Sequence, residues 1–295
     1  MKICDKCYFL FYFILNFISF ILIIVFELLT TTFASQKFHM IQLFTSLFSL
    51  TMLILTRNKP GYLEKDKIQE EEDLQKKTLS PSIETAHFNF ESTPIVHYNL
   101  MPSNGCEACK IAKLPLRSHH CEKCKRCVKS FDHHCWILAG CIGENNKVEF
   151  IIFLFFQTLS LICSSIGITK IMSRKINEGT IYILTFIFSI LCLLGIIFFW
   201  IFIFHLYTLF TNQTSFELFN TDQCPYLALF SLERNKILTQ RGIILNNNYR
   251  YRPFDVGFKR NLNLYLDKMV HKKNVIKWEE IFFENLKTNH ISLNC

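Results

Sequence analysis

The sequence predicts an α-helical integral membrane protein with four transmembrane helices and a small cysteine-rich module between the second and third. Half of the 295 residues are hydrophobic, and 31 of them are phenylalanine. The apolar residues gather in four blocks without a charge, at Tyr8–Phe26, Phe38–Thr56, Phe150–Thr169 and Ile181–Phe210. Because a helix needs about 20 apolar residues to cross the hydrocarbon core, each block is long enough to span a membrane. The fourth block is longer than required, so we expect it to tilt or to extend beyond the bilayer.

Two alternative interpretations of the apolar blocks are less consistent with the sequence. A cleaved signal peptide at Tyr8–Phe26 would have a shorter apolar region and a small-residue cleavage site, and a second span follows closely here. Four uncharged runs of this length also rarely share one soluble core. We therefore expect two spans in residues 1–56, a linker in 57–102, the cysteine-rich module in 103–149, two more spans in 150–210 and a tail in 211–295.

The orientation in the membrane follows from charge and thiol chemistry together. Most of the Lys and Arg lie in the central segment and the tail, which favours the cytosolic side for both. Three basic residues in the short connection after the third block (Lys170, Arg174 and Lys175) argue weakly for the reverse. Closely spaced thiols persist as metal ligands only on the reducing side. We therefore expect the N-terminus, the module and the tail to be cytosolic.

The module holds seven cysteines and four histidines between positions 106 and 141, with three CxxC steps. A two-residue gap lets both sulfurs of a tight turn face one zinc ion, which takes four ligands in a structural site. Dithiol oxidoreductases also use CxxC, but beside a βαβ pattern that is absent from this sequence. Two ions would use eight of the eleven groups, whereas three ions would need one more ligand than the segment has. The count predicts a zinc-stabilised module with two ions and a surplus that includes a thiol.

Cys135 is the best candidate for the surplus thiol. It lacks a CxxC partner and directly follows Asp132, His133 and His134. An imidazole that accepts the thiol proton populates the reactive thiolate. A carboxylate that orients the imidazole completes a three-part arrangement. Spacing alone, however, leaves open which cysteine is spare.

These residues resemble a known family. The run CxxC…HHCxxCxxCxxxxDHHC from Cys106, followed by an apolar block, resembles the DHHC protein S-acyltransferases, also called palmitoyltransferases. Two features of the tail add to the resemblance. Thr214-Ser215-Phe216-Glu217 is similar to the family's TTxE motif, and Arg252–Gly257 with Asn261 and Tyr265 is similar to its C-terminal motif.

The resemblance implies a site, a reaction and a set of partners. Cys135 would be the nucleophile, His133 its general base and Asp132 the residue that orients that base. The two structural zinc ions would be held by Cys₃His sets, one of Cys106, Cys109, His120 and Cys127, the other of Cys121, Cys124, His134 and Cys141. A fatty acyl group would pass from acyl-CoA to Cys135, and then to a cysteine of a membrane-associated substrate protein. The family also implies an endomembrane location, in the ER or Golgi.

Three positions depart from the family pattern, and they motivate an alternative function. Trp136, Ile137 and Gly140 replace the usual Pro, Trp and Asn after the reactive cysteine, although the spacing to Cys141 is kept. The alternative is a catalytically weak, zinc-dependent membrane scaffold. A RING-like ubiquitin-ligase module fits less well, since the ligand spacing is compressed. Nucleic-acid binding is not expected either, because the basic residues of the module sit at a membrane surface, where lipid or CoA phosphate is the natural partner.

Overall fold

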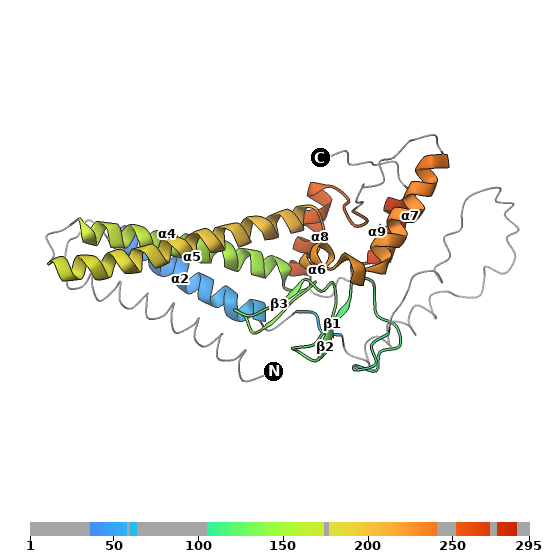
Figure 1. The fold of residues 1–295 in the computed structure, drawn as a ribbon, viewed down its shortest axis with the longest axis horizontal. Helices are drawn as coiled ribbons and strands as arrows, with labels where there is room; N and C mark the ends of the chain where they lie inside the picture. Colours follow the sequence, from blue (N-terminus) through green and yellow to red (C-terminus); the bar gives the residue numbers. More distant parts are fainter. Residues whose placement is uncertain are drawn as a thin grey trace, which may run out of the picture.

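The computed structural model describes residues 36–57, 60–63, 105–173, 177–240, 252–271 and 276–287 (Figure 1). Three long helices run side by side along the longest axis: α2 (Gln36–Arg57), α4 (Lys147–Met172) and α5 (Glu178–Phe210). Each is long and apolar enough to cross a membrane. The expected first span, Tyr8–Phe26, lies outside the described residues, as does most of the expected linker.

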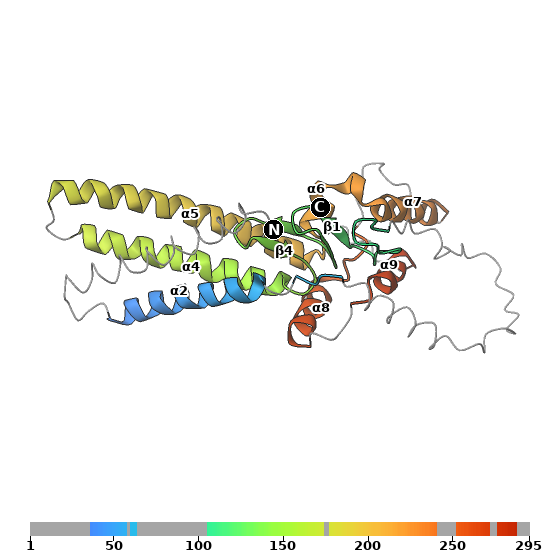
Figure 2. The same cartoon turned by 90° about the horizontal axis from the view of Figure 1, so that it is seen from below.

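Helix α4 lies between α2 and α5 in this array (Figure 2). Its contact with α2 is partly polar, because Ser46 bonds to Ser160 at 2.7 Å and Ser49 donates to Gln157 at 2.7 Å. Small hydroxyl side chains of this kind let membrane helices approach closely and hydrogen-bond across the interface. Helix α4 begins at Lys147, three residues before the apolar block, so its first turn belongs to the cysteine-rich module.

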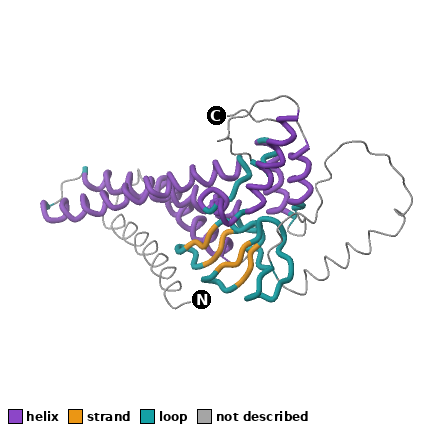
Figure 3. The backbone as a smooth tube through the Cα atoms, turned by 45° about the vertical axis from the view of Figure 1, so that its right-hand side comes forward, coloured by secondary structure: helices purple, strands orange, loops and turns teal. Residues whose placement is uncertain are grey.

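The cysteine-rich module sits at one end of the helices and contains two short antiparallel hairpins (Figure 3). The first pairs β1 (His119–Cys121) with β2 (Arg126–Val128), and the second pairs β3 (His133–Cys135) with β4 (Gly140–Ile142). Three-residue strands bury little apolar surface, so an isolated pair is only marginally stable. The hairpins therefore need other support, which the clustered thiols can provide.

The tail packs around the module and the end of α5. It contains α6 (Ser215–Phe219), the 3₁₀ turn η3 (Thr221–Gln223), α7 (Pro225–Gln240), α8 (Phe258–Val270) and α9 (Trp278–Lys287). The pattern of Val275–Lys287 suits either a membrane-interface helix or one packed on the module. In the structure Phe282 is fully buried and the Trp278 indole donates to Glu144 of the module at 2.8 Å. Helix α9 is thus a packed helix.

Candidate metal centres and active site

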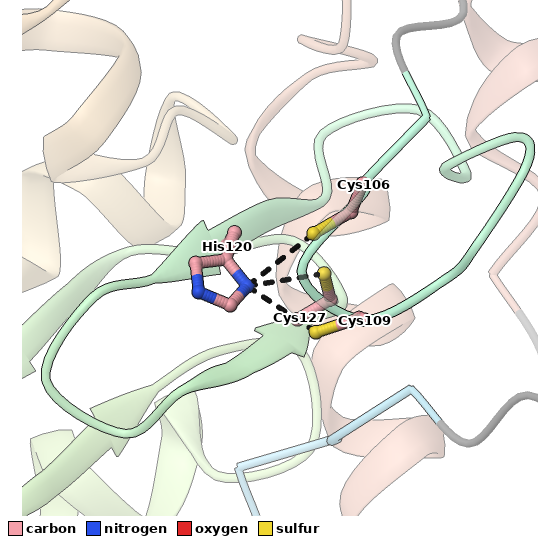
Figure 4. Close-up of side chains that lie close together, drawn as sticks. All are labelled: Cys106, Cys109, His120 and Cys127. Atoms are coloured by element: carbon pink, nitrogen blue, oxygen red, sulfur yellow. Dashed lines mark hydrogen bonds between the residues drawn. The ribbon is translucent and has the colours of Figure 1, made fainter.

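The first metal-binding cluster joins Cys106, Cys109, His120 and Cys127. The His120 Nδ1 atom lies 3.4, 3.3 and 3.7 Å from the three sulfurs, in that order (Figure 4). His120 and Cys127 face each other across the β1–β2 hairpin. One pair of ligands therefore comes from the CxxC turn and the other from two paired strands.

The second cluster joins Cys121, Cys124, His134 and Cys141 in the same way. The His134 Nδ1 atom lies 3.5, 3.3 and 3.8 Å from the three sulfurs. His134 and Cys141 are again cross-strand partners, in the β3–β4 hairpin. The two ligand sets interleave along the chain: the β1–β2 hairpin carries ligands of both clusters, whereas the β3–β4 hairpin carries ligands of the second.

Both clusters are compatible with zinc ions. Four ligands placed about 2.0–2.3 Å from one ion in a tetrahedron lie roughly 3.3–3.8 Å from one another, as these atoms do. All described cysteines are free thiols, and within each cluster the ligand atoms lie within 4.8 Å of one another. Three thiols and an imidazole form a donor set that zinc prefers in structural sites.

Three six-residue turns of the module share one backbone geometry, and we call them knuckles: Cys106–Ile111, Cys121–Arg126 and Cys135–Gly140. In each the first and sixth residues pair antiparallel. The fifth residue has a left-handed backbone, with φ of 54°, 55° and 47° at Lys110, Lys125 and Ala139. Cysteine spacing alone does not indicate this repeat, because the fourth position of the third knuckle is Leu138.

Cys135 occupies the first position of the third knuckle, where Cys106 and Cys121 are metal-cluster residues. The fourth position, Cys109 or Cys124 in the other knuckles, is Leu138, which is 1% exposed. Because leucine cannot bind a metal, Cys135 is left without a partner sulfur and lies outside both clusters. The third knuckle thus holds a thiol in the geometry of a zinc ligand without the metal.

Asp132 is the centre of a buried polar cluster beside Cys135. It is 1% exposed, and its carboxylate accepts hydrogen bonds from His133 Nδ1 at 2.8 Å and from Lys147 Nζ at 3.2 Å. Ser215 donates its backbone N–H at 3.0 Å and its hydroxyl at 2.8 Å. Burial alone would raise the pKa of Asp132, but the Lys147 ammonium and the His133 bond hold it well below its usual range. Asp132 is therefore a stable carboxylate.

His133 lies between this carboxylate and the Cys135 thiol. Burial lowers the pKa of its imidazole, but hydrogen bonds to Asp132 and Cys135 more than offset that cost and raise it to about 9. The edge of the Phe150 ring contacts the imidazole, with ring centroids 5.5 Å apart. A protonated imidazole beside a thiol favours the thiolate. The three predicted residues are thus brought together as a candidate triad.

His205 joins this cluster from α5, although its position at the end of an apolar block indicates only a helix end. It is buried, and its Nδ1 atom lies 3.8 Å from Asp132 Oδ2. Asp132, His133 and His205 are close enough together to hold a metal ion. The Lys147 ammonium already neutralises the carboxylate, however, and would repel a cation. We therefore interpret the three residues as a polar contact at the end of α5 rather than as a metal site.

The four-residue segment Thr214-Ser215-Phe216-Glu217 begins α6 with a capping box. The Thr214 hydroxyl accepts from the Glu217 N–H at 3.1 Å, and the Glu217 carboxylate accepts from the Thr214 N–H at 2.8 Å. This reciprocal pair fixes the first turn of the helix. It also points Ser215 at Asp132. The Glu217 carboxylate binds Arg117 in addition to the Thr214 N–H.

Arg117 connects the module to the tail. Its guanidinium donates to both Glu217 oxygens at 2.8 Å and lies over the rings of Phe254 and Trp278, at 4.1 and 4.3 Å. It also donates to the Asn212 side-chain oxygen, which accepts a further bond from the Tyr265 hydroxyl at 3.1 Å. The tail motif residues Glu217, Phe254 and Tyr265 are therefore linked to the module through this buried network around Arg117.

We predict that Arg117→Met lowers the free energy of unfolding by about 3–5 kcal/mol, because it leaves the Glu217 carboxylate buried without its partner. Thermal unfolding followed by tryptophan fluorescence would measure the loss. The double variant Arg117→Met/Glu217→Gln is the matched control and should recover part of it. A single variant as stable as the unaltered protein would contradict this account.

The structure also places His119, which belongs to neither metal cluster, and the residues after Cys135 that depart from the family pattern. His119 packs against Phe216, with ring centroids 4.3 Å apart. Trp136 is 52% exposed, and the Lys123 ammonium lies 3.3 Å from its ring centroid. Gly140 is buried, but a Cβ there would meet only ordinary contacts, so the backbone does not require glycine. Ile137 is partly buried and packs against the apolar cluster that contains Cys135, so Trp136 is the most exposed of the three departures.

The fold and site define a membrane protein with a two-centre Cys₃His module that presents a largely buried Asp–His–Cys cluster, in which the His133 side chain is partly exposed. Residues 99–222 match the family model described as DHHC palmitoyltransferase. It is 34% identical over 170 residues to a provisionally named ZDHHC-type palmitoyltransferase 7 of Dictyostelium discoideum, covering 55% of this chain and 34% of that protein.

Two further relatives are also similar to this chain. One, named a probable protein S-acyltransferase 15, is from Arabidopsis thaliana and is 30% identical over 189 residues, covering 61% of this chain and 65% of the relative. Another, palmitoyltransferase SWF1 of Saccharomyces cerevisiae, is 34% identical over 109 residues, covering 35% of this chain and 32% of the relative. The chain thus spans less than two thirds of the length of each of these relatives.

Proposed function

We propose that this protein is a protein S-acyltransferase that moves a fatty acyl group, palmitoyl in the first instance, from acyl-CoA to cysteines of membrane-associated proteins. The observation that carries the proposal is the contact of the partly exposed His133 with the buried Asp132 and Cys135, with Cys135 outside both metal clusters. Nucleophilic cysteines need a base within reach and a third group that orients the base. The match of residues 99–222 to the DHHC palmitoyltransferase model supports the same reaction class.

In the first step the Cys135 thiolate attacks the acyl carbonyl carbon of acyl-CoA. A carbon–sulfur bond forms to Cys135, the carbon–sulfur bond to CoA breaks, and the His133 imidazolium gives its proton to the departing CoA thiolate. Asp132 keeps the imidazole in place through its Nδ1 bond. The buried Lys147 ammonium in turn holds the Asp132 carboxylate.

In the second step the substrate thiol gives its proton to His133 and attacks the acyl carbonyl carbon of the Cys135 thioester. The acyl group passes to the substrate sulfur, and Cys135 leaves as a thiolate beside the imidazolium. The starting state of the protein is thereby restored. Zinc ions bound by the two Cys₃His clusters supply folding free energy rather than reactive chemistry.

We also propose that the N-terminus, the zinc module and the C-terminal tail are cytosolic, in a membrane of the ER or Golgi. The free thiols of the module support a reducing compartment. Acyl-CoA is an amphiphile, so a site where the module meets three apolar helices suits its soluble head and its lipid tail. The domain boundaries 1–56, 57–102, 103–149, 150–210 and 211–295 belong to this proposal, as does a fourth span.

Incubation of the purified protein with labelled palmitoyl-CoA tests the proposal. The protein should acquire hydroxylamine-sensitive label, and it should pass that label to a cysteine-containing peptide. Cys135→Ser should abolish both the labelling and the transfer, because serine has no thiol. Cys192→Ser, which alters a thiol in the middle of α5, is the matched control and should behave like the unaltered protein.

The two outcomes that contradict the proposal differ in meaning. If Cys135→Ser takes up label as fast as the unaltered protein, the nucleophile assignment fails. If the protein takes up label on Cys135 but never transfers it to any peptide or co-expressed protein, the scaffold alternative motivated by Trp136, Ile137 and Gly140 is favoured.

A further inference from the structure

His205 lies at the cytosol-proximal end of α5, against the candidate triad. It is 4% exposed, and its Nδ1 atom lies 3.8 Å from the Asp132 oxygen that binds His133. The rings of His205 and His133 have centroids 5.3 Å apart and are tilted by 33°. The helix that carries His205 is thus in direct contact with the residues that position the proton acceptor.

The surroundings of His205 are aromatic. The edge of its ring meets Phe150 at a centroid distance of 5.0 Å, and Phe204 lies 5.2 Å away on its own helix. These aromatic neighbours do not by themselves require an imidazole. His205 Nδ1, however, has no hydrogen-bond partner among the described residues. Burying a polar nitrogen without a partner is unfavourable, so packing alone does not account for a histidine here.

The proposed reaction gives the unpaired nitrogen a use. His133 must serve two sulfur atoms in turn, that of Cys135 and that of the incoming thiol, so its ring has to shift without losing Asp132. A closing movement of about 1 Å would bring His205 Nδ1 within hydrogen-bond distance of Asp132 Oδ2. Ser215 and Lys147 hold the carboxylate from the module and tail, and His205 faces it from the α5 side.

We infer that His205 is a positioning residue, resting on the proposed function: its ring limits the movement of His133, and its Nδ1 donates to Asp132 during turnover. His205 does not touch the reacting atoms in this scheme. It acts through Asp132 and His133, and it links the triad to a membrane-spanning helix. Loss of the donor should therefore slow the chemical step and leave binding of the acyl donor unchanged.

Two replacements of His205 separate its polar role from its packing role. His205→Gln keeps a hydrogen-bond donor, whereas His205→Phe keeps an aromatic ring and loses the donor. Tyr207→Phe is the matched control, since it removes a hydroxyl from the same helix that bonds to Arg252 outside the triad. Zinc content and thermal unfolding verify that each variant is folded. His205→Leu, which also lacks the donor, replaces His205→Phe if that variant loses zinc.

We expect His205→Phe to lower kcat for palmitoyl transfer to a cysteine peptide by about 10–100-fold, with KM for palmitoyl-CoA unchanged within about twofold. His205→Gln should stay within about threefold of the unaltered protein, as should Tyr207→Phe. Full activity of His205→Phe, or equal losses in the Phe and Gln variants, would overturn the inference.

A second readout does not depend on acyl transfer. The rate at which iodoacetamide alkylates Cys135 reports how well His133 is held beside the thiol, and it should fall in His205→Phe more than in His205→Gln. If the unaltered protein acquires no acyl label but His205→Phe still alkylates more slowly than His205→Gln, the proposed function fails while the positioning role of His205 stands. If acyl labelling is normal and all variants alkylate equally, the inference alone fails.

Discussion

Replacing Asp132 with asparagine should lower the rate of Cys135 acylation by about 10³–10⁴-fold, the scale seen when the carboxylate of a catalytic triad is removed. An amide cannot accept from His133, Ser215 and Lys147 at once as the carboxylate does. It also cannot stabilise the imidazolium that forms beside the thiolate. Single-turnover labelling with palmitoyl-CoA, followed by hydroxylamine release, would measure the rate.

The same replacement should reduce stability, which calls for a control. Lys147 is 2% exposed, and Asp132→Asn removes the negative charge beside its ammonium, which keeps its bond to the Gln213 carbonyl at 2.7 Å. Breaking a buried pair on one side costs about 3–5 kcal/mol. The double variant Asp132→Asn/Lys147→Met should regain stability while remaining inactive, because the missing charge is still needed by His133. A single variant that keeps more than a tenth of the rate would refute this role.

Removal of zinc should unfold the module and abolish acyl transfer together. Binding of a structural zinc ion contributes about 10–16 kcal/mol in small zinc-binding peptides, whereas three-residue strands contribute little by themselves. A strong chelator should release two zinc ions per chain, expose the thiols to labelling reagents and stop acylation. Circular dichroism should show that most helical signal survives, since α2, α4 and α5 do not depend on the metal.

Two single variants would locate the effect. His120→Ala disturbs the first cluster, which is farther along the chain from Cys135, and His134→Ala disturbs the second, whose ligand adjoins both His133 and Cys135. We expect both variants to lose zinc and His134→Ala to lose more activity. Acylation that persists with zinc below a tenth of an ion per chain would contradict a structural role for the metal.

The parts of the fold with a strong local pattern could be predicted from the sequence. Uncharged apolar blocks of 19 residues or more predict helices, and α2, α4 and α5 follow three of them closely, since a charge-free run has few other structures open to it. Ligand counting predicts two metal ions, and the structure contains two Cys₃His clusters with the compositions that the family resemblance implies.

The contacts that complete the site could not be predicted in this way. Arg117 meets Glu217 from 100 positions away, and Ser215 meets Asp132 from 83 positions away, so neither pair leaves a local pattern. His205 lies in an apolar block, where a single histidine is compatible with a helix end or a buried contact. The third knuckle was hidden for a different reason, because Leu138 replaces the cysteine that would have revealed the repeat.

The place of His134 in strand β3 has a consequence for how the proposed activity depends on zinc. His134 binds at the second metal centre and stands directly between His133 and Cys135 in one strand. A cell short of zinc would therefore lose the reactive thiol's alignment as soon as that centre empties, before any membrane helix is affected. The fraction of chains that hold zinc would then set the fraction whose thiol is aligned, independently of how many chains are made.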